Sequence, residues 1–349
     1  MYNLLANIKY YPGLGQIMPI VERHRHFGGS ISPSTVHTIM AANGQPFTMK
    51  EIISRMTYSK KEIGKGFKPF LEKFSILDEV HWSEWAIDES ISQVCKDIAT
   101  EGIKHVDISL SPNKYMKDNK WSIKDALKFV SRSFLHHTKR NNITCGLLLA
   151  LRYDSSRAIQ QSALEAINDS TMFDKWIGID LIGNELFYDP IFYKKILDRW
   201  HRHDKVLRAH VGELPGTARH VKSAILDLDA NRIAHGIYAS NETLKLAIDK
   251  GVYFDLAIHS NIYTGVINNV KKHPAKRMMD MGCKITLNTD DPIQFGCTLR
   301  EEMILAQRAG LNSSDIKRAM TVAAEPMQVD RMAVDEPVSI LEMSPVYQV

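Results

Sequence analysis

Cysteine is scarce in this sequence of 349 residues, and long apolar runs are missing. The four cysteines are scattered and form no CxxC pair, which argues against a disulfide framework and a thiolate metal site. No stretch approaches the roughly 20 apolar residues of a membrane span, and residues 1–20 hold no continuous apolar run of signal-peptide length. We therefore expect an intracellular, cytoplasmic protein that has no membrane partner.

Positive and negative charges nearly balance. The formal net charge is +4, and no dense run of lysine and arginine accompanies it. Nucleic acid is therefore not an expected partner. The hydrophobic content of 44% and the charged content of 24% are those of an ordinary globular chain, and the length allows a large core.

No GxGxxG follows an early strand, so the usual site of a doubly wound dinucleotide-binding sheet is missing. Short apolar or β-branched runs recur instead, each followed by a segment with apolar residues three and four apart. Eight such units predict an α/β fold, a (β/α)8 TIM-type barrel of parallel strands and helices. The expected strands are Ile17–His26, Ile103–Leu110, Ile143–Arg152, Trp176–Ile182, Lys205–Val211, Asn231–Gly236, Val252–Ile258 and Cys283–Asn288.

Helices are expected between these strands. Ser122 and Asn241 stand where N-cap residues would. An extra helical region, about residues 32–100, separates the first two strands, and no Pro/Gly/Ser-rich linker flanks it. We therefore expect one barrel domain over residues 1–349, with a helical insertion near the barrel mouth. The expected helices include Ser122–Asn141, Asp189–His203, Gly216–Asp227, Asn241–Lys250 and His273–Gly282.

Ionisable residues collect at the predicted C-terminal ends of four strands, where a parallel barrel carries its active site. These ends read HRH at 24–26, HVGE at 210–213, AHG at 234–236 and NTDDP at 288–292. His24 and His26 are two residues apart, so a β-strand directs both imidazoles to one face. An HRH string alone is weak evidence, because the same string at 201–203 and the pair at 136–137 are expected on the exposed surface.

His210 and Asp290 add a third imidazole and a carboxylate at equivalent strand ends. Together with His24 and His26 they offer three nitrogens and one oxygen, the ligand pattern of a catalytic Zn²⁺ with a position left for water. Other divalent first-row metals accept the same donors. The sequence thus predicts one metal ion per chain, with zinc preferred.

Glu213 and His235 complete the candidate catalytic set. Glu213 follows His210 by three residues, and a carboxyl group shielded from water beside a metal has a raised pKa that suits proton donation. The alternative role for Glu213 is an acid at the start of the next helix. His235 stands between small residues in RIAHG, which allow close approach at the barrel mouth and make a packing role less expected.

Taken together, these strings resemble the motifs of the adenosine deaminase family. HRHFGGS at 24–30, HVGE at 210–213, RIAHG at 232–236 and NTDDP at 288–292 are similar to the family's HxH with a Gly-containing turn, HAGE, R-I-x-HG and TDDP. GIDLIGNE at 178–185 and SNIYTG at 260–265 resemble GIDLAGDE and SNIQTG. The motifs span about residues 22–327 in the family's order, which makes the resemblance specific.

The resemblance implies a hydrolase that replaces the amino group at purine C6 with oxygen. The four strand-end ligands would hold the metal, Glu213 would protonate N1, and His235 would orient the attacking water. Asp291 would contact N7, and the Gly183 amide would contact N3. The expected ligand is a purine nucleoside or nucleotide. The implied substrate-binding residues are Gly183, Asp291, His26 and Gly28.

Departures from the family bear on the substrate. The acid of the family's HLDG turn, which contacts the ribose 5′-hydroxyl, is replaced by Gly28, and the family's GDE and RYSP read GNE and SLSP here. We expect deamination of adenosine or 2′-deoxyadenosine. The alternative is a 5′-modified or N6-substituted adenine nucleoside or nucleotide, such as 5′-methylthioadenosine or N6-methyl-AMP. A non-purine cyclic amidohydrolase is less expected, because it has no need of Asp291 and Gly183 as purine contacts.

Overall fold

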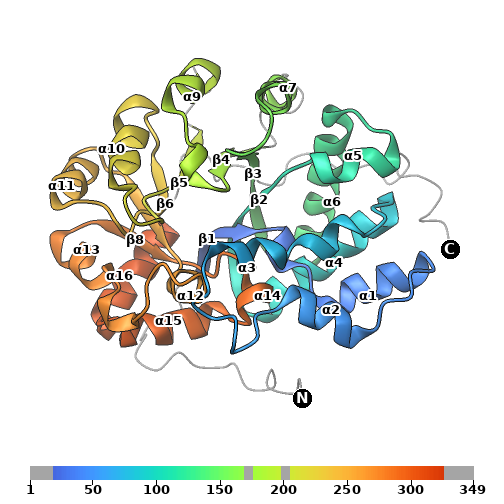
Figure 1. Ribbon diagram of the computed structural model, residues 1–349, viewed down its shortest axis with the longest axis horizontal. Helices are drawn as coiled ribbons and strands as arrows, with labels where there is room; N and C mark the ends of the chain where they lie inside the picture. Colours follow the sequence, from blue (N-terminus) through green and yellow to red (C-terminus); the bar gives the residue numbers. More distant parts are fainter. Residues whose placement is uncertain (1–18, 169–175, 198–204, 326–349) are drawn as a thin grey trace.

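Eight parallel strands form the centre of the molecule, and helices surround them (Figure 1). The computed structural model describes residues 19–168, 176–197 and 205–325. Each strand pairs in parallel with the next one along the chain, and its described residues fall within a predicted run, which confirms the predicted α/β barrel. The strands are β1 (Ile20–His26), β2 (Ile103–Leu110), β3 (Thr144–Arg152), β4 (Gly178–Ile182), β5 (Val206–Val211), β6 (Arg232–His235), β7 (Tyr253–Leu256) and β8 (Lys284–Leu287).

The chain after β8 returns to β1 and closes the sheet. Arg25 and Asp290 form a parallel bridge. The His26 amide donates to the Asp290 carbonyl at 2.9 Å, and the Asp290 amide donates to the His24 carbonyl at 3.2 Å. Because the closure runs through the C-terminal end of β1, it brings Asp290 beside the HxH pair.

The predicted helix starts are right in one case and wrong by one residue in another. Ser122 begins α6 with a capping box, since its hydroxyl accepts from the Asp125 amide at 3.2 Å and Asp125 accepts from the Ser122 amide at 3.0 Å. The N-cap of α11 is Ser240 and not the predicted Asn241. Of the predicted helix Asp189–His203, residues 198–203 lie outside the described residues. The helices that follow β2 to β8 are α5 (Asn113–Asn119), α6 (Ile123–Arg140), α7 (Arg157–Ile167), α9 (Pro190–Leu197), α10 (Ala218–Asp227), α11 (Asn241–Asp249), α12 (Ile258–Tyr263), α13 (Ala275–Met281), α14 (Pro292–Phe295), α15 (Leu299–Arg308) and α16 (Ser313–Ala324).

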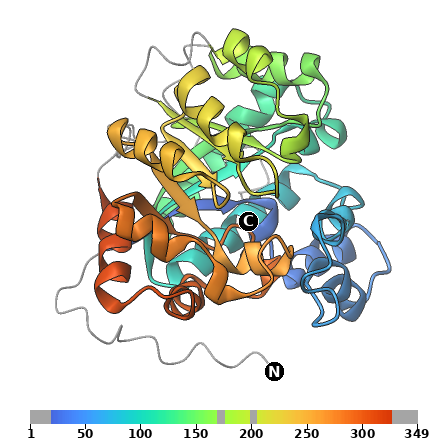
Figure 2. The same cartoon turned by 60° about the vertical axis from the view of Figure 1, so that its left-hand side comes forward.

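The chain between β1 and β2 is helical, as predicted. It contains α1 (Pro33–Ala42), α2 (Met49–Met56), α3 (Phe67–Glu72), the 3₁₀ turn η2 (Ser75–Asp78) and α4 (Glu84–Thr100). α4 packs against β2 and α6 as a barrel helix, so the insertion proper ends before it. Figure 2 shows the other helices in blue as a cluster at one side of the barrel.

The insertion contacts the segments that follow β7 and β8, since the Gly64 amide donates to the Tyr263 carbonyl of α12 at 2.8 Å. The Tyr58 amide donates to the Gln294 carbonyl at 3.0 Å, and the Phe70 ring stacks on Phe295 with 5.5 Å between ring centroids. The insertion therefore lies against the end of the barrel where the strands finish.

One predicted surface residue is buried. His137 was expected to be exposed, but it lies on the face of α6 that packs against α4, with its Nε2 3.1 Å from Oδ1 of Asp88. The other predicted surface pair, His201 and His203, lies outside the described residues. Within the described ranges, no helix is both long and apolar enough to cross a membrane.

Candidate active site

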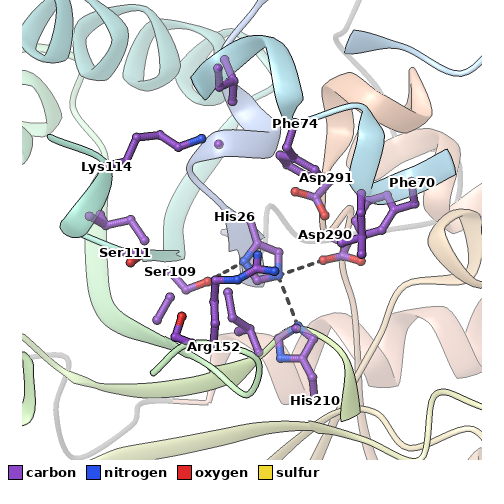
Figure 3. A pocket seen from close by; sticks show the side chains of 18 of the residues that line it. His26, Phe70, Phe74, Ser109, Ser111, Lys114, Arg152, His210, Asp290 and Asp291 are labelled. Carbon is purple, nitrogen blue, oxygen red and sulfur yellow. Dashed lines mark hydrogen bonds and ion pairs between the residues drawn. The ribbon is translucent and has the colours of Figure 1, made fainter. Parts of the chain in front are cut away.

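A cavity of about 610 Å³ opens at the C-terminal ends of the strands (Figure 3). This is the end of a parallel barrel that carries the active site. One wall consists of phenylalanines from the insertion, Phe67, Phe70 and Phe74. The predicted site residues that line the cavity are His26, Gly28, Gly183, His210, Glu213, His235, Asp290 and Asp291.

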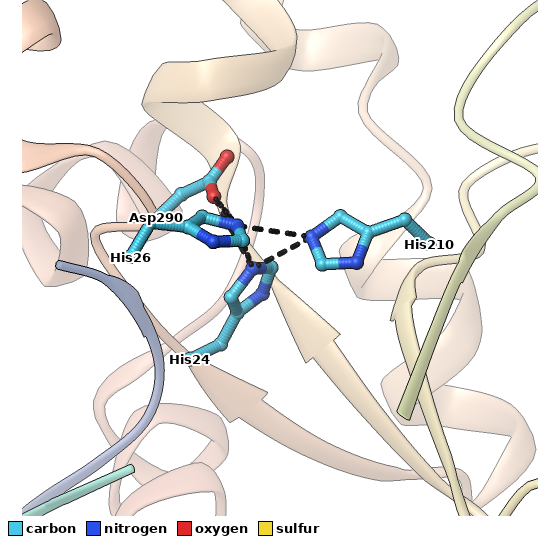
Figure 4. A group of neighbouring side chains, drawn as sticks. All are labelled: His24, His26, His210 and Asp290. Carbon is cyan, nitrogen blue, oxygen red and sulfur yellow. Dashed lines mark hydrogen bonds and ion pairs between the residues drawn. The ribbon is translucent and has the colours of Figure 1, made fainter. Parts of the chain in front are cut away.

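Four side chains from three strand ends meet at the cavity floor (Figure 4). Nε2 of His24 lies 3.3 Å from Nε2 of His26 and 3.0 Å from Nε2 of His210. Nε2 of His26 and Nε2 of His210 are 3.2 Å apart. Oδ1 of Asp290 lies 3.2 Å from His24 Nε2 and 3.1 Å from His26 Nε2. The structure brings all four predicted metal ligands together.

The spacing of these atoms fits a divalent metal. Zinc binds nitrogen and oxygen ligands at about 2.0–2.1 Å, so tetrahedral ligand atoms lie about 3.3–3.4 Å apart. The observed separations of 3.0–3.3 Å are close to this value. The group formed by His24, His26, His210 and Asp290 can therefore hold a divalent ion.

The protonation of His24 also suits metal binding. Burial, together with the positive charge of Arg208, lowers the pKa of His24 to about 4. The imidazole is therefore neutral near pH 7 and has a lone pair available for a metal.

Neighbouring side chains orient the other two imidazoles. Nδ1 of His26 lies 2.7 Å from the Ser109 hydroxyl. Nδ1 of His210 lies 3.1 Å from the Leu181 carbonyl and 3.1 Å from Oδ1 of Asp180. When Nδ1 donates a proton to such a partner, the Nε2 lone pair faces the centre of the group. The Asp180 carboxylate and the Leu181 carbonyl can only accept, so they select this tautomer for His210, whereas the Ser109 hydroxyl holds the His26 ring in place.

The Asp180 carboxylate is held charged. Burial alone would raise its pKa, but the Arg208 guanidinium, with Nη2 at 2.5 Å, holds the pKa well below its usual value. A charged carboxylate is the stronger acceptor for the imidazole N–H. The sequence analysis did not identify Asp180, although it lies in the GIDLIGNE motif.

Two residues of the site have strained backbones. His235 and Asp290 both have a φ of +63°, in the left-handed region that residues other than glycine rarely adopt. Each follows or ends a strand, so the change of backbone direction turns its side chain toward the cavity. Strain of this kind costs of order 1–3 kcal/mol per residue and is typical of functional sites.

Glu213 is buried at the cavity wall, where burial and the nearby carboxylate of Asp290 raise its pKa well above the usual value. Its loop is held by Glu185, whose carboxylate accepts from the amides of Gly212 at 2.7 Å and Glu213 at 2.8 Å. Glu213 itself is therefore not needed as a helix-start acid, and its carboxyl group is free to face the cavity. The sequence analysis gave Glu185 no role, although it is the acid that ends the GIDLIGNE motif.

His235 faces both Glu213 and the metal group. Its Nε2 lies 3.7 Å from Oε2 of Glu213 and 3.9 Å from Oδ2 of Asp290. Its Nδ1 lies 3.2 Å from the side-chain amide of Asn261, a partner that the sequence analysis missed. Burial lowers the pKa of His235 well below its usual value, so the ring is neutral near pH 7.

Asp291 lies beside the metal group, and one of its carboxylate oxygens is available to bind a substrate. Its Oδ1 has no hydrogen-bond partner among the described residues, and burial together with the charge of Asp290 raises its pKa. A Cβ atom on Gly29 would lie 1.9 Å from this Oδ1, which explains the glycine there. Gly183 has a φ of +92°, which also requires glycine.

A second group of potential metal ligands already has hydrogen-bond partners within the protein. His259, Cys297 and Glu302 lie close together. The Glu302 carboxylate accepts from the backbone amides of Ile258 and His259 and lies 2.5 Å from Nδ1 of His259. Glu302 therefore stabilises the start of α12.

Comparison with known proteins agrees with this geometry. Residues 19–336 match the Adenosine deaminase family. An adenosine deaminase of Clostridium acetobutylicum is 27% identical over 299 residues, covering 82% of this chain and 86% of the relative. The chain belongs to the adenosine deaminase family, which confirms the predicted hydrolytic deaminase.

Solved structures show the same fold. A zinc-bound amidohydrolase from Burkholderia ambifaria has a TM-score of 0.78 at 20% identity, covering 88% of this chain and 84% of that one. The Arabidopsis protein ADAL in complex with IMP has a TM-score of 0.74 at 20% identity, covering 87% and 90% of the two chains. Both likenesses confirm the barrel.

Proposed function

We propose that this chain, as a single barrel domain, catalyses the hydrolytic deamination of an adenine nucleoside, with adenosine and 2′-deoxyadenosine as the reference substrates. The observation that carries the proposal is the meeting of three imidazoles and a carboxylate with Glu213 and His235 in one cavity. Deamination at C6 needs an activated water, a proton donor for the ring and a proton acceptor for the water. These residue types supply all three.

Zinc is the proposed metal. The ligand set of three histidines and one aspartate matches its preferred donors, and the zinc-bound Burkholderia amidohydrolase shares this fold. When bound, the metal lowers the pKa of a water molecule so that hydroxide is available near neutral pH.

The protein groups move the protons. Glu213, kept protonated by its raised pKa, donates to N1, which makes C6 electrophilic. His235, which is neutral, accepts a proton from the water that attacks C6. His235 returns this proton to the amino group, the C6–N bond breaks and ammonia leaves. The C6 hydroxyl loses its own proton, which restores Glu213, and the carbonyl oxygen of inosine remains. The purine is held by Asp291 at N7 and by the Gly183 amide at N3.

The test is turnover of adenosine by the zinc-loaded chain, followed by release of ammonia and by the change in ultraviolet absorbance. We expect inosine to form, and His210→Ala to lose both zinc and activity. His81→Ala serves as the control, since its side chain is 54% exposed and His81 does not line the active-site cavity. Absence of deaminated product from every adenine nucleoside and nucleotide tested would refute the proposal.

A second candidate substrate is an adenine nucleoside or nucleotide that is modified at the 5′ end or substituted at N6. Gly28 favours it, because the wall where the family carries an acid lacks one here. An added Cβ at Gly28 would lie 3.7 Å from the nearest atoms, so the position is not crowded.

A further inference from the structure

Two basic side chains line the active-site cavity. Lys114 lies on α5, after β2, and Arg152 ends β3. Figure 3 shows Lys114 and Ser111 on the side of the cavity opposite Asp290 and Asp291. The reaction proposed above assigns no step to either cation.

Lys114 is close to the place expected for the substrate's 5′ end. An added Cβ at Gly28, the position of the family's 5′-hydroxyl contact, would lie 3.7 Å from Cδ1 of Leu77. The next residue, Asp78, lies with its Oδ1 2.8 Å from Nζ of Lys114. The ammonium group therefore lies near the same wall as Gly28.

Arg152 lies near the ribose side of the purine. Its Nε and Nη2 donate to Asp154 at 3.0 and 2.8 Å. The same Asp154 carboxylate would be 3.1 Å from a Cβ on Gly183, the residue proposed to meet purine N3. N3 and the ring nitrogen that bears the ribose, N9, are both bonded to C4. Nη1 of Arg152 has no partner among residues 19–168, 176–197 and 205–325.

Neutral residues add further hydrogen-bond donors. Ser111, Asn113 and Ser155 also line the cavity. The acids nearby are Asp78 and Asp154, and each is paired with one of the two cations. With no acid at Gly28, this end of the cavity combines cations with hydroxyl and amide donors, which is the chemistry that binds phosphate.

We propose that the substrate carries a 5′-phosphate, and that Lys114 and Arg152 determine this specificity. The inference rests on the proposed deamination and names its substrate class as an adenine nucleoside 5′-monophosphate. A phosphate carries a charge of about −1.5 to −2 at pH 7 and accepts several hydrogen bonds. Arg152 presents its Nη1 edge to the phosphate while Asp154 holds the other edge. Lys114 leaves its ion pair with Asp78, whose side chain is 70% accessible, and pairs with the phosphate instead.

The experiment compares kcat/KM for AMP and for adenosine in four variants of the zinc-loaded chain. Lys114→Met and Arg152→Gln remove the two cations. Lys68→Met and Arg157→Gln are the matched controls, since both residues are surface cations paired with acids outside the cavity. We expect wild type to prefer AMP. The AMP-to-adenosine ratio should fall about 10-fold or more in each cavity variant, the size of a lost charge-assisted hydrogen bond. The controls should keep the wild-type ratio.

A binding measurement separates recognition from turnover. IMP should bind wild type more tightly than inosine does, and the difference should shrink by the same factor in Lys114→Met and Arg152→Gln. If Lys114 only joins the insertion to the barrel, its variant lowers the melting temperature but leaves both ratios unchanged, and the inference is overturned. Deamination of adenosine with no preference for AMP also overturns it while leaving the proposed function intact. Failure to deaminate AMP, adenosine and every other adenine nucleoside or nucleotide tested refutes the proposed function itself.

Discussion

Gly28→Asp restores the acid that the family's turn carries and tests where the 5′ end of the substrate lies. The structure shows room for the change, because the nearest atoms to an added Cβ are Cδ1 of Leu77 and Cδ1 of Phe74, each 3.7 Å away. Both neighbours are apolar and offer the new carboxylate no partner. A carboxylate there can accept a hydrogen bond from a ribose 5′-hydroxyl. Gly29, in contrast, has no room for a side chain, since an added Cβ would collide with Asp291.

The expected effect has two parts. A charge-assisted hydrogen bond to the 5′-hydroxyl contributes roughly 1.5–3 kcal/mol, or about 10–150-fold in kcat/KM for adenosine. A carboxylate about 5 Å from a phosphate is repelled by about 3 kcal/mol per pair of unit charges at an effective dielectric constant of about 20. The cavity is open to solvent, which screens the second effect. We therefore expect the AMP-to-adenosine ratio to fall at least about 10-fold.

The assay measures kcat/KM for both substrates in wild type, Gly28→Asp and Gly28→Asn. Asparagine has the size of aspartate without the charge, so it separates the hydrogen bond from the repulsion. Only aspartate should discriminate strongly against AMP. A ratio that Gly28→Asp leaves unmoved means that the 5′ end does not lie near Gly28, and the comparison with the HLDG turn then fails.

Three further predictions follow from the site and the core. Asp290→Ala should lose the metal and the activity together, and elemental analysis of a metal-free yet fully active enzyme would contradict it. Glu213→Gln should lower kcat by at least about 10² with the metal retained, whereas more than a tenth of wild-type kcat would place the acid elsewhere. Burial lowers the pKa of His273 to about 4, below the usual 6.5. As the pH drops from 6.5 to 4, His273 therefore takes up a proton in the unfolded chain but not in the folded one. The free energy of unfolding decreases over this range. His273→Gln should remove up to about 3 kcal/mol of this loss in urea unfolding, while His81→Gln should not.

The sequence predicted the barrel because its signals are local. Each strand is a short apolar run with polar residues at its end, as Ile103–Leu110 illustrates with identical predicted and observed bounds. The four metal-group residues were also accessible to sequence reasoning, because parallel strands finish at one end of a barrel. Their convergence follows from topology once the strands are known.

The residues that orient the site were not accessible in the same way. Ser109 contacts His26 only because β2 pairs with β1 in the observed register, and Asp180 contacts His210 because β4 lies beside β5. Nothing in the local pattern around these residues distinguishes them from ordinary strand residues. The burial of His137 was not predictable for the same reason, since it results from a contact with α4. Each depends on packing between distant segments.

The two ends of the cavity are built differently. The catalytic end consists of strand ends in a closed sheet, with strained backbones at His235 and Asp290 that the surrounding structure must hold. The opposite end combines α5, the end of β3 and the insertion, where Lys114 and Asp78 meet across two separate segments. A side chain there can change without moving the metal group. Substrate choice in this fold can therefore vary while the deamination chemistry stays the same, which is why Gly28 and Lys114 are informative positions.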